Sequence, residues 1–414
     1  MNNEPAAALG ASAASATRRS RTMLTACLIV FMAQMATTVY LPSLTIVARD
    51  LRMSQSLAEL SISIFVIGAA VPVPFWGQAA QRWGRRRPLL ISLALFAVTS
   101  GLLMLSRTAP ELLTLRALQG IGGGGAAIIA RIVVRDNWSG DELARRLSVL
   151  SIAFITALGG GQFLGGLIGQ YSRWQTGFAL MALTAAGAAA LVLTVPLQPG
   201  VAAADSGMWR AYRAMLRRPG FIGPACAGGL GFATTVTLQE VSPFVFREHF
   251  HLAVMDFGGF GLLIGLAYFS GAMVVNRLVG RLGGRALMRK GAGIIGIATL
   301  AMPAIWFVHV LPANGAWLDT LALWLFMGLY CATIFGQAVL FPNTMALAVS
   351  DAREYGAHAM ALCGFLQQGL AGIAAAASVL FRHGASWTVA VVALGLATAL
   401  QVGFKAAKPP RAGN

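Results

Sequence analysis

The chain has 414 residues, of which 57% are hydrophobic and only 11% are charged. In soluble globular domains about a quarter of the residues are charged, so this composition excludes an ordinary water-soluble protein. The 31 lysines and arginines outnumber the 14 acidic residues and give a formal net charge of +17. So basic a chain could bind nucleic acid, and the positions of the basic residues test this alternative.

Apolar stretches of about 20 residues recur along the whole chain, and this is the length that a helix needs to cross a hydrocarbon core of about 30 Å. They predict an all-α membrane protein with twelve transmembrane helices. The expected spans are 22–44, 57–79, 88–106, 109–133, 147–169, 175–195, 220–245, 257–279, 290–310, 318–341, 357–380 and 387–404. Residues 1–21 are rich in alanine and serine, and we expect a disordered cytoplasmic tail there. Residues 405–414 are expected to form a second cytoplasmic tail.

The basic residues gather on one side of these spans. With the N-terminus inside the cell, most of the 31 lysines and arginines fall in cytoplasmic loops or at the adjoining span ends, where Arg131 is also counted. The outer loops hold Arg49, Arg52, Arg107, Arg173, Arg247 and Arg382. This is the positive-inside pattern of membrane proteins. It predicts a multi-pass protein of the inner (plasma) membrane, in contact with the lipid bilayer, with both termini cytoplasmic and no nucleic-acid partner.

The longest polar interruption, 197–219, lies near the middle of the chain, with six predicted spans on either side. An internal repeat supports this division, because Arg82-Trp83-Gly84-Arg85-Arg86 after the second span matches Arg281-Leu282-Gly283-Gly284-Arg285 after the eighth. We therefore expect an N-terminal six-helix bundle over 22–196, a cytoplasmic linker over 197–219 and a C-terminal six-helix bundle over 220–404. Two such pseudo-symmetric halves are the architecture of a major facilitator transporter.

The loop after the second span reads Gly77-Gln78-Ala79-Ala80-Gln81-Arg82-Trp83-Gly84-Arg85-Arg86-Arg87-Pro88 and resembles the loop-two signature of the major facilitator superfamily, G-x-L-x-D-R-x-G-R-R. In that family the loop latches the two halves together on the cytoplasmic side through its acidic residue. Gln81 stands where the aspartate is usual, and it forms hydrogen bonds without a charge, so the latch is expected to be weaker. In the alternative interpretation, the basic residues only anchor the topology. The residues assigned to the latch are Gly77, Gln81, Arg82, Gly84, Arg85 and Asp136.

The fourth span contains the sequence L-R-A-L-Q-G-I-G from Leu115, which resembles the family signature R-x-x-Q-G-x-G. Arg116 falls well inside this span, where a cation is costly unless it faces a cavity or a partner. The resemblance implies that Arg116 takes part in proton coupling or substrate binding, with Gln119 beside it. In the alternative interpretation, Arg116 donates structural hydrogen bonds to neighbouring carbonyl groups.

The fifth span carries Gly159-Gly160-Gly161-Gln162-Phe163-Leu164-Gly165-Gly166, which resembles the antiporter signature with Gln162 at the usual proline position. Gln162 either faces the substrate or packs against the eighth span. Three further motifs, Tyr40-Leu41-Pro42, Phe341-Pro342-Asn343 and Gly364-Phe365-Leu366-Gln367, narrow the resemblance to the bicyclomycin-resistance type of drug:proton antiporters.

Many relatives of this type carry an aspartate or glutamate just before the Tyr-Leu-Pro sequence of the first span, and Thr38 takes that place here. Threonine cannot carry the proton. Glu240 is the acidic residue of greatest interest, because Pro243 can break the seventh span and open backbone to the cavity. By helical rise Glu240 also lies close to the outer surface, so a solvated position at the rim is the alternative.

The polar side chains left inside the spans are mostly neutral, which suits a polar, uncharged or zwitterionic small-molecule substrate. The residues assigned to the substrate cavity are Gln34, Thr38, Tyr40, Arg116, Gln119, Gln162, Glu240, Asn343 and Gln367. The wider set of cavity candidates includes Thr37, Gln239, Gln337 and Gln368. Proton coupling is assigned to Arg116 and Glu240. Each of these residues could instead make hydrogen bonds between helices.

Together these features predict an efflux transporter that exports a drug, or an endogenous metabolite such as a siderophore, by alternating access and proton antiport. An uncoupled facilitator, an importer and a membrane sensor that binds a ligand without transporting it are the alternatives. The sequence contains no nucleophile elbow, P-loop or metal-binding pattern, and its four cysteines show no CxxC spacing. We therefore expect no enzymatic activity, no cofactor and no metal. The partners are expected to be the substrate and protons, and the transporter a monomer.

Overall fold

The computed structural model describes residues 4–138, 140–195, 197, 208–310, 316–378 and 387–406, and all regular elements in this part of the chain are helices. Those of the first half are α1 (Glu4–Thr38), η1 (Leu41–Ser43), α2 (Leu44–Asp50), α3 (Gln55–Ala70), α4 (Val73–Arg82), α5 (Arg86–Leu103), α6 (Ala109–Asn137), α7 (Gly140–Tyr171) and α8 (Gln175–Thr194). They are followed by α9 (Met208–Met215), α10 (Pro219–Glu248), α11 (Val254–Leu282), α12 (Gly284–Val310), α13 (Ala316–Asp351), η2 (Arg353–Tyr355), α14 (Gly356–Ser378) and α15 (Trp387–Ala406).

Within the described residues, ten helical segments are long and apolar enough to cross a membrane. The first combines α1, η1 and α2, and the second combines α3 and α4. α12, with 27 residues, and α15, with 20 residues, bring the number to the predicted twelve. The prediction of an all-α membrane protein is confirmed.

The first helix differs from the prediction at its N-terminal end. α1 begins at Glu4, so it includes residues 4–21, for which the sequence analysis expects disorder. Alanine is abundant in this segment and is the strongest helix former, which explains why the helix extends this far. The other end agrees with the sequence, because α1 stops at Thr38 and Pro42 lies in the short helix η1 that follows.

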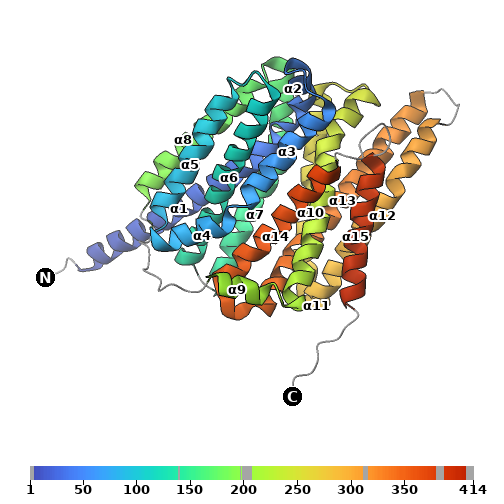
Figure 1. The fold of residues 1–414 in the computed structure, drawn as a ribbon. Coiled ribbons are helices and arrows are strands. Elements are labelled where there is room, and N and C mark those ends of the chain that lie inside the picture. Colours follow the sequence, from blue (N-terminus) through green and yellow to red (C-terminus); the bar gives the residue numbers. More distant parts are fainter. Residues whose placement is uncertain are drawn as a thin grey trace.

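The helices form two bundles with the same internal pattern, which stand side by side in Figure 1. α1 contacts α6, α7 and α8, as α10 contacts α13, α14 and α15. α5 contacts α6 and α8, as α12 contacts α13 and α15. Gly84 and Gly283, which follow the second and eighth spans, both have a φ of 77°, a left-handed conformation that favours glycine. The repeat seen in the sequence is thus the same turn used in two pseudo-symmetric halves.

Two helix pairs make most of the contact between the bundles, α3 with α14 and α7 with α11. α7 and α11 meet through glycines. A Cβ atom added to Gly166 would lie 2.8 Å from the Cα of Gly258, and one added to Gly159 would lie 3.1 Å from the Cα of Gly265. Backbone therefore packs directly against backbone, as small residues allow between membrane helices. We call this contact the glycine seam.

We call the end of the bundles that carries residues 82–87 and α9 the basic end, which lies at the bottom of Figure 1. α9 packs on the second bundle there, where Tyr212 and Met215 join a buried cluster with Phe221 and Leu362. The segment predicted as a linker therefore contains a helix. Residues 198–207 of that segment lie outside the described part of the chain.

α10 runs unbroken from Pro219 to Glu248, so the expectation that Pro243 can break this span is wrong. Proline has no N–H, and Pro243 leaves the carbonyl group of Gln239 without its helical donor. The Oγ of Ser242 donates a hydrogen bond to that carbonyl at 3.2 Å. The side chain replaces the missing backbone bond, and the helix continues.

We expect Gly166→Ala to destabilise the protein, because the added methyl group would force α7 and α11 apart. Overpacking of this kind typically costs about 1–3 kcal/mol. Gly160→Ala is the control in the same helix, since no described atom lies within 4 Å of a Cβ added there. Thermal unfolding of the purified variants measures the difference, and equal unfolding temperatures would contradict the importance of the seam.

Candidate functional site

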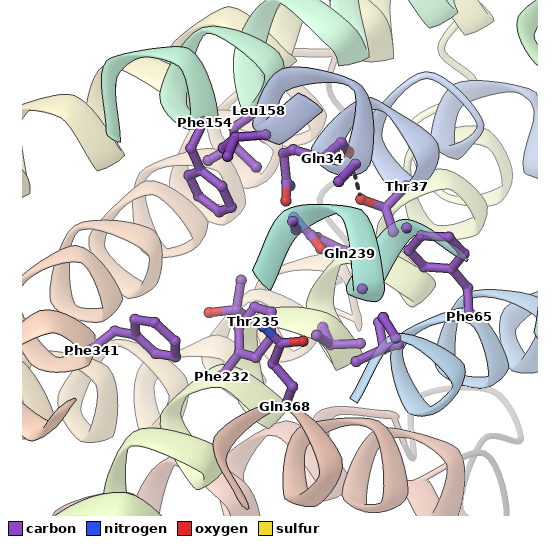
Figure 2. A pocket seen from close by; sticks show the side chains of 18 of the residues that line it. Gln34, Thr37, Phe65, Phe154, Leu158, Phe232, Thr235, Gln239, Phe341 and Gln368 are labelled. Atoms are coloured by element: carbon purple, nitrogen blue, oxygen red, sulfur yellow. Dashed lines mark hydrogen bonds between the residues drawn. The ribbon is translucent and has the colours of Figure 1, made fainter. Parts of the chain in front are cut away.

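A cavity of about 150 Å³ lies between the two bundles. α1, α3, α6 and α7 line it from the first bundle, and α10, α11, α13 and α14 line it from the second. Figure 2 shows labelled side chains of both bundles around this space. Its polar lining residues are Gln34, Thr37, Arg131, Thr235, Gln239, Tyr268, Gln337 and Gln368. A space enclosed by both halves is where a transporter of this architecture binds its substrate.

The cavity also has a large aromatic surface. Phe65 and Phe154 line it from the first bundle, and Phe232 and Phe341 from the second. Aromatic side chains bury a large apolar area with little conformational freedom to lose. The cavity can therefore hold a molecule that combines an apolar body with groups that form hydrogen bonds.

A second cavity, of about 100 Å³, lies at the basic end. It is lined by residues of α4, α6, α9 and α14 and by Arg85. Arg131 lines both cavities, so the two adjoin at this side chain. Burial raises the pKa of Tyr212, another lining residue, to about 12, and its hydroxyl group therefore stays neutral.

Near the opposite end, a hydrogen bond from Ser63 of α3 to the carboxylate of Glu240 of α10 joins the bundles. Glu240 is fully buried, so the alternative of a solvated rim position does not hold. Glu240 follows Gln239, which lines the cavity, but its own side chain is not part of the lining. Glu240 lies instead in the contact between the two halves.

Arg116 is fully buried inside the first bundle and does not line the cavity. Its guanidinium donates hydrogen bonds to the carbonyl groups of Ala36, at 2.9 Å, and Ser61, at 3.3 Å, which belong to α1 and α3. It also donates to the Oε1 of Gln119 at 2.7 Å, and Gln119 donates in turn to the Oγ of Ser100 at 2.8 Å. This is the geometry of the structural alternative, in which one arginine holds several helices together.

Two aromatic rings flank the same guanidinium. Its Cζ lies 4.7 Å from the ring centre of Tyr40 and 4.5 Å from that of Phe65. The hydroxyl group of Tyr40 shares a hydrogen bond of 2.9 Å with Ser61 and thus belongs to the Arg116 network. Because Phe65 lines the cavity, Arg116 lies behind this ring and out of the lining.

Thr38 and Gln162 both lie in contacts between helices. The Oγ1 of Thr38 donates a hydrogen bond to the carbonyl oxygen of Ala157 in α7 at 2.8 Å. Gln162 is 1% exposed, and its side chain packs against Gly261 of α11. An ionised acid at position 38 could not donate to that carbonyl, which is consistent with threonine there.

Asn343 and Gln367 are likewise bonded inside the second bundle. Asn343 donates to the carbonyl of Val339 at 2.7 Å, and Gln367 donates to the Oγ1 of Thr344 at 3.0 Å. Of the residues assigned to the cavity in the predicted site, Gln34 lines it. The cavity is lined by Thr37, Gln239 and Gln368, which are the neighbours in sequence of the predicted Thr38, Glu240 and Gln367.

Sequence reasoning missed Arg131, together with the ring of Tyr268 on the facing helix. Arg131 already falls inside the predicted span 109–133 but is counted there with the basic residues of the cytoplasmic end. Because α6 continues to Asn137, Arg131 lies deeper than that end and lines the cavity. The signal that could have identified it is the apolar pair Val133-Val134 after Arg131, which continues the helical pattern.

The residues assigned to the latch meet at the second cavity in part. Arg85 forms an ion pair of 2.7 Å with Asp136 and donates to the carbonyl of Ala80 at 2.5 Å. Gly77 and Gln81 line the cavity opposite the first turns of α14, whereas Gly84 forms the left-handed turn and Arg82 is exposed. Gln81 has no negative charge. A carboxylate is present at this end of the protein in Asp136, the ion-pair partner of Arg85.

A membrane-spanning pair of pseudo-symmetric six-helix bundles around a central cavity defines a class of small-molecule transporters. The chain matches the family model for the Major Facilitator Superfamily over residues 26–376. It belongs to this superfamily, and it is a transporter rather than an enzyme.

Proteins with related sequences carry names from drug resistance. The bicyclomycin resistance protein homolog of Haemophilus influenzae is 23% identical, with 86% of this chain and 90% of that protein covered. The chloramphenicol resistance protein CraA of Acinetobacter baumannii is 22% identical, with coverages of 66% and 67%. The MFS-type transporter YdgK of Bacillus subtilis is 28% identical, with coverages of 79% and 80%. The resemblance to the bicyclomycin-resistance type is confirmed.

Solved structures share the fold at low identity. The crystal structure of a D-xylose-proton symporter has a TM-score of 0.72 at 16% identity, covering 91% of this chain and 96% of that one. A POT family transporter in complex with 5-aminolevulinic acid has a TM-score of 0.76 at 12% identity, with coverages of 93% and 95%. These likenesses concern the architecture alone.

We expect Arg116→Met to lower the unfolding temperature, because it removes the hydrogen bonds to the carbonyl groups of Ala36 and Ser61 and leaves the buried Oε1 of Gln119 without its donor. A buried group that loses its partner costs about 1–3 kcal/mol. Arg87→Met, at an exposed position of the basic end, removes the same charge and should have little effect. Thermal unfolding in detergent measures both variants, and an unchanged Arg116→Met protein would contradict the structural role.

The ion pair between Arg85 and Asp136 should show energetic coupling, because the two side chains are only 12% and 11% exposed. Arg85→Gln and Asp136→Asn are each expected to destabilise the protein, and the double variant should lose less than the two losses added together. Coupling between residues in contact typically amounts to about 0.5–3 kcal/mol. A double-mutant cycle of unfolding free energies tests this, and strictly additive losses would count against the pair.

Proposed function

We propose that the protein is an exporter that moves a small polar molecule out of the cell by alternating access. The observation that carries this proposal is the central cavity, which both bundles line and which adjoins the cavity at the basic end through Arg131. The distribution of arginines supports placing the basic end in the cytoplasm. In that orientation the cavity takes up its substrate from inside the cell, as an exporter requires.

In this proposal the protein lies in the inner membrane as a monomer surrounded by lipid, and both of its termini are in the cytoplasm. Its substrate is a drug or an endogenous metabolite such as a siderophore. The names of the bicyclomycin and chloramphenicol resistance proteins support a drug. The mixed aromatic and amide lining supports a molecule with both apolar and polar parts.

Export is driven by proton antiport, and Glu240 is the proton carrier. Its carboxylate accepts a hydrogen bond from Ser63 across the contact that must open when the cavity turns outward. A hydrogen bond to an ionised carboxylate is stronger than one to a neutral group. Protonation of Glu240 therefore weakens the closed contact, and the state of the contact changes the affinity for the proton in return. Arg116 acts indirectly by holding α1, α3 and α6 in place.

We expect Glu240→Gln to abolish substrate-dependent proton movement, because glutamine can still accept a hydrogen bond from Ser63 but cannot carry a proton. The test uses purified protein in liposomes, with bicyclomycin and chloramphenicol as probes and a pH-sensitive dye inside. Proton movement should fall at least tenfold in Glu240→Gln. Glu248→Gln, at an exposed position of the same helix, is the control and should behave like the wild type.

The same assay separates the alternatives. Flux of a probe without proton movement in the wild type would indicate an uncoupled facilitator, and inward accumulation would indicate an importer. Binding without flux would indicate a sensor. Proton movement that persists in Glu240→Gln would show that another group carries the proton.

A further inference from the structure

The central cavity carries a single kind of charge. Among the described residues that line it, Arg131 alone is charged. Arg131 is half-buried in α6, about 9 Å from the end of that helix at a rise of 1.5 Å per residue. A cation inside a membrane protein is costly unless an anion or hydrogen-bond acceptors compensate it.

The nearby carboxylate is already engaged. Asp136 lies 2.7 Å from Arg85 and 3.6 Å from Arg135. In the described parts of the chain, no carboxylate forms an ion pair with Arg131. The guanidinium group of Arg131 is thus available to a ligand in the cavity.

The rest of the lining suits the remainder of such a ligand. Tyr268 and the amide groups of Gln337 and Gln368 can form hydrogen bonds, while Phe154 and Phe341 offer apolar surface. A guanidinium binds a carboxylate through two parallel hydrogen bonds, and a single guanidinium matches a single negative charge.

We propose that Arg131 binds a carboxylate group, and that the cavity takes small organic acids with a partly apolar, aromatic body in addition to neutral molecules. This inference rests on the proposed function, because it assigns the ligand of the same cavity. It adds monocarboxylates and zwitterions to the neutral drugs named above, which can occupy the aromatic and amide lining without using Arg131. The site lies where the two cavities meet, so the acid group is bound as the molecule enters.

The test compares acids with their neutral amides of nearly equal shape. Benzoate, salicylate and cinnamate are titrated into the purified protein beside benzamide, salicylamide and cinnamamide, and binding is measured by calorimetry. At least one acid should bind about tenfold more tightly than its amide, a difference that one charge-assisted interaction readily supplies. Arg131→Gln should reduce this preference to about onefold, and Arg131→Lys should keep part of it.

Arg87→Gln is the matched control, because it removes the same charge at an exposed position outside both cavities. Unfolding temperatures show whether each variant is folded. The inference is overturned if no acid in the panel binds, if the amides bind as tightly as the acids, or if Arg131→Gln keeps the preference.

Flux measurements with the same compounds separate this inference from the proposed function. If Arg131→Gln loses the acid preference in binding but the wild type transports none of the compounds, the anion-binding site is supported and export of these compounds is contradicted. If the wild type exports an acid and Arg131→Gln exports it equally well, export is supported and the role of Arg131 is contradicted.

Discussion

Hydrocarbon offers no hydrogen-bond partner, so the protein must satisfy each polar group within its own membrane helices. The structure meets this requirement locally. Ser242 takes over the carbonyl that Pro243 leaves unpaired, and Thr38 donates to a carbonyl of the neighbouring α7. Many serines and threonines of the spans donate to a carbonyl of their own helix, and a smaller set of polar side chains connects neighbouring helices. The groups that remain for a ligand are those that line the space between the two bundles.

The two arginines of α6 illustrate this division. Arg116 donates to carbonyl groups of the first bundle, and its guanidinium lies between two aromatic rings of the same bundle. Arg131, four turns further along the same helix at 3.6 residues per turn, reaches the cavity instead. The same side chain is thus a structural connector at one depth and a binding group at another. The surroundings, and not the residue type, decide between the two roles.

The sequence was sufficient for much of the architecture, because span length and loop charge follow directly from the thickness of the membrane and from its topology. The Gly84 and Gly283 repeat also identified the two halves. The lining of the cavity could not be predicted in the same way. Adjacent residues on a helix point about 100° apart, and these helices are apolar on most sides, so hydropathy does not tell Thr37 from Thr38 or Gln367 from Gln368. Packing against α7 and α13 decides which of them faces the cavity. The missed Arg131 has a simpler cause, since α6 continues to Asn137 and Arg131 therefore lies deeper than the span end with which it is counted.

The glycine seam between α7 and α11 has a consequence for how the two halves can separate. Where side chains of two helices interdigitate, they must change rotamer before the helices can separate. At the two glycine pairs, Gly159 with Gly265 and Gly166 with Gly258, backbone atoms meet directly, and each pair of atoms contributes about 0.1–0.2 kcal/mol of dispersion energy. The helices can thus roll or slide over one another through many small, similar steps. A contact of this kind allows the two bundles to rock against each other while the side-chain packing inside each bundle stays the same.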